Sequence, residues 1–366
     1  MTATDADGNT SEFSAEQTVA APVIPAQPLG NRGIYFDGVD DKVVTNTFSL
    51  NDFTIEFWIK TKQTGSASAD PNWYNGFGLV DADQSGSGDD FGVSLADGKI
   101  RFGIANIATA ETTLESNATP LVNDGAWHHI AAVRNNTTNT LQIYIDGVLN
   151  NSTTAVATGA VGVAPLTFGA SANSGGFFNG QLDEVRVFNT VRTAAQIATD
   201  MAAQAANGAV AYWNLDQSTG TTANDLSGNA NNGTLQNGTL WALRVTDNTD
   251  NSGAGLGSLR QAITEANTDT DTDYIDFSIQ QANTATVSTI TMADLGGGIQ
   301  NALPVITESI FIDGYSAYGS SPNTANFLAL NNAQIRIELD CQYIGIPPNA
   351  MPPLSSGLEL NASNST

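Results

Sequence analysis

The chain has 366 residues and a formal net charge of −25, from 12 Lys and Arg against 37 Asp and Glu. This length exceeds most single hydrophobic cores, so we expect two or three modules. The acidic balance argues against nucleic acid and anionic membrane surfaces as partners, because both require a basic patch. The single cysteine, Cys341, cannot form an intrachain disulfide, and no apolar run approaches the ~20 residues of a membrane span.

The first thirty residues predict the end of one module and a linker. Residues 1–20 contain two short strand-like segments around a turn at residues 5–9, and they resemble the closing strands of a module in long bacterial surface proteins. A disordered tail is the alternative. Residues 21–30 form a Pro-rich linker, since proline removes hydrogen-bond donors and favours extended backbone.

A two-residue periodicity dominates the next two hundred residues. Phe53–Lys60 places apolar residues at its odd positions and mostly polar residues between them, which predicts a strand with one buried face. Leu141–Ile145 repeats the pattern before a hairpin turn at Asp146–Gly147. The phase changes between Leu182 and Val185, so we expect a β-bulge there.

Four blocks carry a family resemblance: Gly33–Val44, Gly125–Val133, Leu141–Gly147 and Phe178–Asn189. In this order they resemble a laminin G-like, concanavalin A-type jelly roll, which we place at residues 31–241. The resemblance implies an all-β fold with an antiparallel jelly-roll sandwich. It implies an extracellular location and binding of a glycan or a cell-surface protein.

The remaining residues, 242–366, predict a second β architecture. Strand-like segments begin at Ser288, Ile310, Ile335 and Leu358, separated by 22, 25 and 23 residues. This spacing is typical of a parallel β-helix. The segment resembles the start of right-handed parallel β-helices in large bacterial adhesin-like surface proteins, and we expect its strands to form the first, truncated coils.

Two short helices are predicted by their caps. Thr193 and Gln196 form a capping box before an apolar stripe, and Asn207–Gly208 ends that helix. Ser258 begins a second helix with one apolar face, which we expect to cap the β-helix.

No catalytic residue is predicted. His128 and His129 are the only histidines, and as neighbours on a strand they point to opposite faces. They cannot chelate one metal or form an acid/base pair. Among enzymes, only a glycosidase with a carboxylate pair remains chemically possible.

One calcium ion is implied near the rim of the jelly roll. Laminin G-like domains often hold such an ion, and the resemblance indicates Asp37, Asp40 and Asp183 as its ligands. Acids gathered at a turn also require a cation to offset their repulsion.

A second calcium candidate comprises Asp81, Asp83 and Asp89, which lie in a partial EF-hand pattern. Gly92 occupies the position of the bidentate acid, so the alternative is a solvated hairpin loop. The loop at residues 70–76 contributes Trp73 and Tyr74, which we predict as sugar-stacking ligand residues. They could instead fold down as a lid on the sandwich.

These features predict a non-enzymatic segment of a large secreted or cell-surface adhesion or structural protein. Glycan or a cell-surface protein is the expected partner, with calcium as a structural cofactor. One alternative is the accessory and N-terminal part of a β-helix polysaccharide-degrading enzyme. Another is a subunit that self-associates into a surface filament or appendage.

Overall fold

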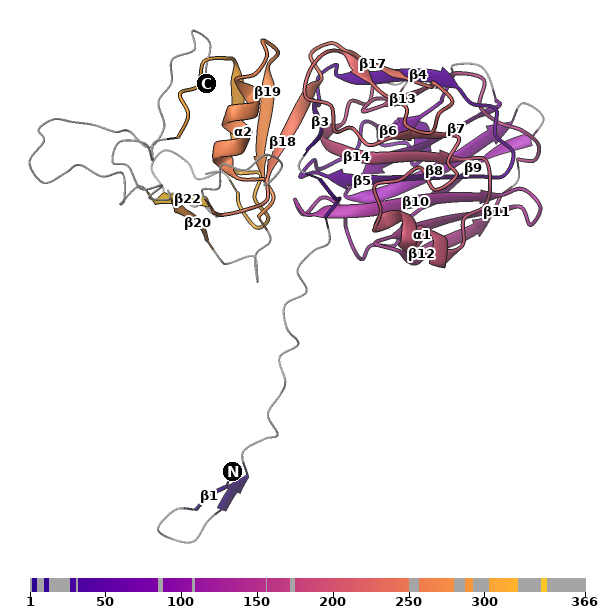
Figure 1. Ribbon diagram of the computed structural model, residues 1–366. Helices are drawn as coiled ribbons and strands as arrows, with labels where there is room; N and C mark the ends of the chain where they lie inside the picture. Colours follow the sequence, from indigo (N-terminus) through magenta and orange to yellow (C-terminus); the bar gives the residue numbers. More distant parts are fainter. Residues whose placement is uncertain are drawn as a thin grey trace, which may run out of the picture.

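The computed structural model describes residues 2–4, 10–12, 27–30, 32–84, 88–106, 109–155, 157–171, 175–249, 257–279, 287–291, 303–321 and 337–340. Within these ranges the protein is a β-sandwich followed by a smaller C-terminal unit (Figure 1). The all-β prediction is therefore confirmed. No helix in these ranges has the length and apolar character needed to cross a membrane.

The first sheet has the strand order β12-β11-β10-β5-β14-β3-β18-β19-β21, with β15 also paired to β14. Its strands are β3 (Arg32–Asp37), β5 (Phe53–Lys60), β10 (Trp127–Asn135), β11 (Thr140–Ile145), β12 (Val148–Thr154), β14 (Asn179–Phe188), β15 (Ala211–Trp213), β18 (Leu240–Val245), β19 (Asp273–Phe277) and β21 (Ile310–Asp313). Pairing is antiparallel as far as β18 and parallel from β18 to β21.

The second sheet has the order β16-β17-β4-β13-β6-β7-β8-β9 and packs against the first (Figure 1). Its strands are β4 (Lys42–Thr47), β6 (Phe77–Asp81), β7 (Asp90–Ala96), β8 (Lys99–Asn106), β9 (Thr109–Glu115), β13 (Pro165–Phe168), β16 (Thr222–Ala223) and β17 (Gly233–Gln236), and the short helix η1 (Trp73–Asn75) precedes β6.

Two small strand pairs lie outside the sandwich. Strands β1 (Thr2–Thr4) and β2 (Thr10–Glu12) form an antiparallel hairpin, as predicted for the N-terminal segment. Most of the predicted linker lies outside the described residues. Strands β20 (Ser288–Thr291) and β22 (Ile337–Asp340) form a parallel pair.

The two-residue pattern of β5 correctly identifies the core. Its odd positions, from Phe53 to Ile59, are buried between the sheets. Its even positions are buried as well, because other elements cover the outer face of the first sheet. Glu56 lies beside Asp200 of α1, and Lys60 contacts Asp276 of β19. Charged side chains are consequently enclosed on a face where the sequence pattern predicts partial exposure.

The predicted β-bulge and N-terminal helix caps are present, but the first helix ends at Met201 and not at Asn207–Gly208 as predicted. The register of β14 against β5 shifts between Asp183 and Arg186, and Glu184 has φ +54°. Helix α1 (Ala194–Met201) begins with the Thr193–Gln196 capping box. Helix α2 (Leu259–Ala266) begins at Ser258, whose side chain accepts a hydrogen bond from the Gln261 amide.

The C-terminal unit extends the first sheet. The predicted boundary between residues 241 and 242 lies inside β18, which pairs antiparallel with β3 and parallel with β19. Helix α2 connects β18 to β19, as a parallel pair requires. Alternate side chains of these strands, including Leu243, Ile275 and Ile310, share a second apolar core with α2.

The stacking expected from the 22–25-residue spacing is wrong. The strand at Ser288 pairs with Ile337, and the strand at Ile310 pairs with Asp273. From β19 to β22, strands that follow one another in sequence therefore belong to different sheets. The segment around Leu358 lies outside the described residues.

Candidate binding site on the second sheet

An open hollow of about 690 Å³ lies on the outer face of the second sheet. Its floor includes Val44 of β4 and Thr167 of β13, whose neighbours in sequence point into the core. Val163, Gln84 and Phe177 come from the surrounding loops. Ligand sites commonly have this size and mixture of apolar and polar groups. The antiparallel pairing of β4 with β13 supplies a rigid base.

Charged groups of both signs reach the hollow. Lys42 and Asp83 line it, and Lys42 forms no ion pair with another residue in the described part of the chain. The Lys42 ammonium is therefore available to an acceptor on a ligand. Asp83 links the hollow to a cluster of acids between β6 and β7.

That acid loop contains two of the predicted calcium ligands in close proximity. The amide of Asp83 donates to Asp81 Oδ1 at 2.9 Å, and the amide of Gln84 donates to Asp90 Oδ2 at 3.4 Å. Asp90 is buried, and burial together with the carboxylates of Asp83 and Asp89 raises its pKa to about 7. A bound cation would offset the same repulsion that a proton offsets here.

Asp90 was missed by the sequence prediction. The EF-hand numbering gives weight to Asp89, because position 9 of that pattern supplies an oxygen. In the structure Asp90 begins β7, and its side chain is the more deeply buried of the two. Residues 85–87 of the pattern lie outside the described residues.

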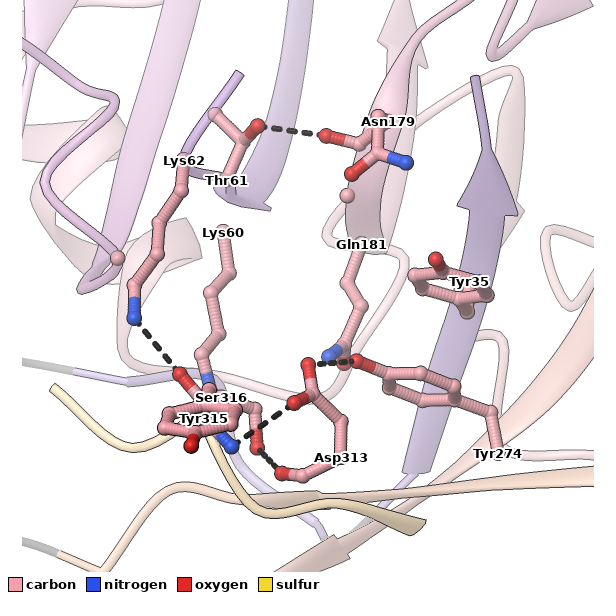
Figure 2. A pocket seen from close by; sticks show the side chains of 12 residues that line it. Tyr35, Lys60, Thr61, Lys62, Asn179, Gln181, Tyr274, Asp313, Tyr315 and Ser316 are labelled. Atoms are coloured by element: carbon pink, nitrogen blue, oxygen red, sulfur yellow. Dashed lines mark hydrogen bonds between the residues drawn. The ribbon is translucent and has the colours of Figure 1, made fainter. Parts of the chain in front are cut away.

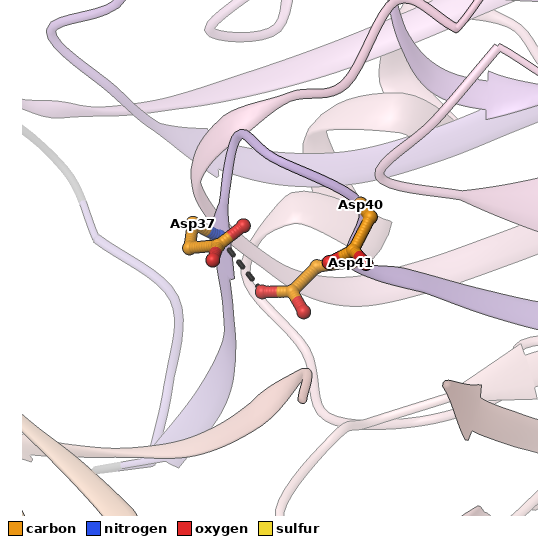
Figure 3. A group of neighbouring side chains, drawn as sticks. All are labelled: Asp37, Asp40 and Asp41. Carbon is orange, nitrogen blue, oxygen red and sulfur yellow. Dashed lines mark hydrogen bonds between the residues drawn. The ribbon is translucent and has the colours of Figure 1, made fainter. Parts of the chain in front are cut away.

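The other calcium candidate lies in the turn between β3 and β4 (Figure 3). Asp37, Asp40 and Asp41 each place one carboxylate oxygen within 4.8 Å of the others. Asp41 Oδ2 accepts a hydrogen bond from the Asp37 amide at 2.8 Å, whereas its buried Oδ1 has no partner among the described residues. Burial, aided by the carboxylates of Asp37 and Asp40, raises the pKa of Asp41 to about 6. These oxygens fit a hard cation such as calcium.

Asp183 does not join this group, which corrects the predicted ligand set. It lies beside Gly33 of β3, four residues from Asp37 and so about 13 Å along the strand. Its carboxylate is fully buried and accepts a hydrogen bond from Arg244 Nη2 at 3.0 Å. Arg244 comes from β18 and also stacks over the Trp127 ring at 4.4 Å. Asp183 is thus one half of an internal ion pair.

Trp73 is also not available to a ligand. Its side chain is fully buried on the outer face of the second sheet, above Gly92 and Gly103, which are partners across β7 and β8. A Cβ atom at either glycine would collide with the indole ring. The alternative of a lid on the sandwich is therefore correct for Trp73. Tyr74 stays half-buried, and its hydroxyl accepts a hydrogen bond from Asn72.

The two histidines have separate environments, as predicted. His128 lies between Asp124 and Asp146, at 3.2 and 2.9 Å, and hydrogen bonds to these carboxylates raise its pKa to about 9 despite burial. His129 is fully buried, and desolvation lowers its pKa to about 3. Its Nε2 lies 3.5 Å from Glu56 Oε2. The pair therefore forms no joint site.

The family comparison matches residues 36–198 to the Concanavalin A-like lectin/glucanases superfamily. The matched part of the sandwich is thus similar to laminin G-like, concanavalin A-type jelly rolls. No curated protein sequence matches the chain.

Several solved structures are similar to this chain at low identity. They include a putative carbohydrate binding protein from Bacteroides ovatus (19% identity, TM-score 0.44, covering 60% of this chain and 61% of that one). A pentraxin from Limulus polyphemus has 13% identity and a TM-score of 0.40, covering 59% and 96%. Domains LG4-5 of the mouse laminin alpha1 chain have 18% identity and a TM-score of 0.33, covering 43% and 41%. The chain thus spans about three fifths of the first of these.

Proposed function

We propose that this chain is a non-catalytic binding segment of an extracellular adhesion or structural protein, and that its jelly roll binds a glycan in the hollow over β4 and β13. The hollow itself carries the proposal. It has the volume of a ligand site, a rigid two-strand base, and a lysine that pairs with no acid among the described residues. Sugar rings present apolar faces and hydroxyl groups, and the lining offers partners for both.

The acid loop beside the hollow supports a role for calcium. Asp83 belongs to both the hollow and the acid cluster. An ion held there would neutralise the loop and could order Asp83 and Gln84 against a ligand. Glycan binding would then depend on calcium because the ion orders this loop, and not because it stabilises the whole domain.

A binding role without catalysis is supported by the positions of the acids. Asp83 and Asp90 are close enough for their carboxyl groups to share a hydrogen bond. A retaining glycosidase holds its carboxyl groups about 5–5.5 Å apart, and an inverting enzyme holds them farther apart. This pair leaves no room for a glycosidic bond between its members.

Attachment to a surface fits the rest of the chain. The parallel strands β18, β19 and β21 extend the first sheet, whereas the hollow lies on the second sheet. Further stacked strands would carry the jelly roll on a rigid stem, as in the start of a parallel β-helix. Weak single-site binding would then gain strength from multivalency.

A glycan panel with matched variants tests this proposal. Val163 lies in the hollow and is 46% exposed, whereas Val148 is 69% exposed on the hairpin between β11 and β12. Val163→Lys should weaken binding about tenfold, equivalent to about 1.4 kcal/mol, and Val148→Lys should leave it unchanged. Equal affinities of both variants and the parent would place the site elsewhere. Release of sugar products from any polysaccharide would show that the chain is an enzyme.

A further inference from the structure

A buried lysine and a buried aspartate meet where the sandwich joins the C-terminal unit. Lys60 ends β5, and Asp276 belongs to β19, 216 residues later. The Lys60 Nζ lies 2.6 Å from Asp276 Oδ2, and the side chains are 7% and 0% exposed. Lys60 also borders a small polar cavity of about 100 Å³ between the two parts of the chain (Figure 2).

The surroundings of this pair favour loss of its charges. Lys60 Nζ donates to Asp276 Oδ2, the Phe277 carbonyl and Ser278 Oγ, but Asp276 Oδ1 has no hydrogen-bond partner among the described residues. Removing two charges from water is costly, and full hydrogen bonding is required to offset that cost. Burial also lowers the pKa of Lys60, which makes the neutral, nucleophilic amine accessible.

A second carboxyl group stands beside the pair. Asp313 of β21 is the register partner of Asp276 on β19, so the two residues share one face of adjacent parallel strands. Its Oδ2 accepts a hydrogen bond from the Tyr274 hydroxyl at 2.7 Å, and its Oδ1 accepts one from the Tyr315 amide at 2.8 Å. Figure 2 shows Asp313 held in this way at the edge of the cavity that Lys60 lines.

We propose that Lys60 and Asp276 form an intramolecular isopeptide bond, with Asp313 as the carboxyl group that relays the proton. Proton transfer within the ion pair gives a neutral amine and a neutral carboxylic acid. The amine nitrogen attacks the Asp276 carboxyl carbon, a C–N bond forms, and a C–O bond breaks. Asp313 takes a proton from the nitrogen of the adduct and passes it to the departing hydroxyl, which leaves as water. One ammonium and one carboxylate thus become one amide and one water molecule, without any oxidant or cofactor.

Proximity supplies most of what this reaction needs. Fixing two reactants in contact can raise their effective concentration to about 10⁵–10⁸ M. The hydroxyl of Ser278 donates to Asp276 Oδ2 at 2.9 Å and polarises the group under attack. The amide would tie β5 to β19 and so fix the parallel strands to the jelly roll.

The intact mass of the folded, full chain is the direct test. We expect a mass one water molecule below that of the sequence, and a linked pair of peptides containing Lys60 and Asp276 after digestion. Lys60→Arg should restore the full mass, because the guanidinium cannot form the amide. The matched control Lys62→Arg, two residues away, should still lose water.

Two further variants distinguish this bond from other losses of water. Asp-Gly sequences such as Asp97–Gly98 can lose water by forming a succinimide, and that loss would persist in Lys60→Arg. In Asp276→Asn, formation of the same amide would release ammonia in place of water. The linked variant would therefore have the same mass as the linked parent. Asp313→Asn should accumulate unlinked chain that remains folded by circular dichroism. A parent with the full sequence mass, or a water loss that maps elsewhere, would overturn the proposal and leave Lys60 and Asp276 as an ion pair.

Discussion

The carboxyl group of Glu56 should make the stability of this protein fall as the pH rises. Glu56 is fully buried between β5 and α1, and neither of its oxygens has a hydrogen-bond partner among the described residues, although His129 Nε2 lies 3.5 Å from Oε2. Burial, reinforced by the nearby carboxylate of Asp200, raises its pKa well above 4.5. Asp200 itself accepts hydrogen bonds from two side-chain nitrogens of Arg192. A protonated Glu56 can donate to this partner, whereas an ionised one cannot.

The magnitude follows from proton linkage. Above pH 4.5 the unfolded chain releases the proton of Glu56 while the folded chain retains it, so the free energy of unfolding falls by about 1.4 kcal/mol per pH unit. Over three units, to pH 7.5, the loss reaches at most about 4 kcal/mol. Glu56→Gln mimics the protonated acid and can donate to Asp200 at every pH. This variant should match the parent near pH 4.5 and become progressively more stable above it.

Denaturant titrations from pH 5 to pH 8.5 measure this difference. Comparing the variant with the parent at each pH cancels the contributions of other titrating groups. Glu308→Gln, at a partly exposed residue of the C-terminal unit, is the control for removing one carboxyl group. A stability gap between Glu56→Gln and the parent that stays constant with pH, or a variant less stable at pH 7.5, would refute the assignment of a protonated Glu56.

Three other predictions concern the charged groups of the sandwich. His128→Asn should destabilise the protein by about 1–2 kcal/mol below pH 6.5, because the raised pKa of His128 stabilises the fold there. The difference in unfolding free energy between parent and variant should disappear as the pH rises through 9. Arg244→Met should cost about 3–5 kcal/mol by leaving Asp183 buried without its partner, and adding Asp183→Leu should recover part of that loss in thermal unfolding. Calcium should raise the melting temperature, EDTA should reverse this rise, and Asp41→Asn should reduce it. A melting temperature that neither calcium nor EDTA changes would count against a calcium site in the turn between β3 and β4.

Local chemistry explains why much of the fold is readable from the sequence. The capping box at Thr193 acts over three residues, and the phase change at Asp183–Glu184 is a local break in alternation. The core positions of β5 follow from the two-residue repeat. Each of these signals lies within one element, so no knowledge of distant partners is needed.

The candidate site depends on distant partners and was only partly predictable. The floor of the hollow joins β4 to β13, more than a hundred residues apart in the chain. The prediction of Asp183 as a calcium ligand was wrong because its ion-pair partner, Arg244, lies 61 residues later in the chain. The burial of Trp73 did have a signal, since isolated glycines in strands, such as Gly92 and Gly103, often mark the close approach of another group.

Several basic side chains lie at the junction between the jelly roll and the C-terminal unit and connect the two. Among the described residues, the Lys and Arg side chains of four positions bond across the junction between the jelly roll and the C-terminal unit. Arg32 pairs with Glu265 of α2, Lys60 with Asp276, and Arg244 with Asp183, while Lys62 donates to the carbonyls of Tyr315 and Ser320.

In an acidic chain, this grouping sets the orientation of the C-terminal strands more strictly than apolar contact alone, because Lys60 and Arg244 are buried and each pairs with one carboxylate across the junction. The hollow lies on the other sheet, so no residue of the junction lines it. Changes at Lys60 should therefore alter the attachment of the C-terminal strands while glycan affinity stays constant. Loss of binding in Lys60→Arg would instead show that the two sheets communicate through the core.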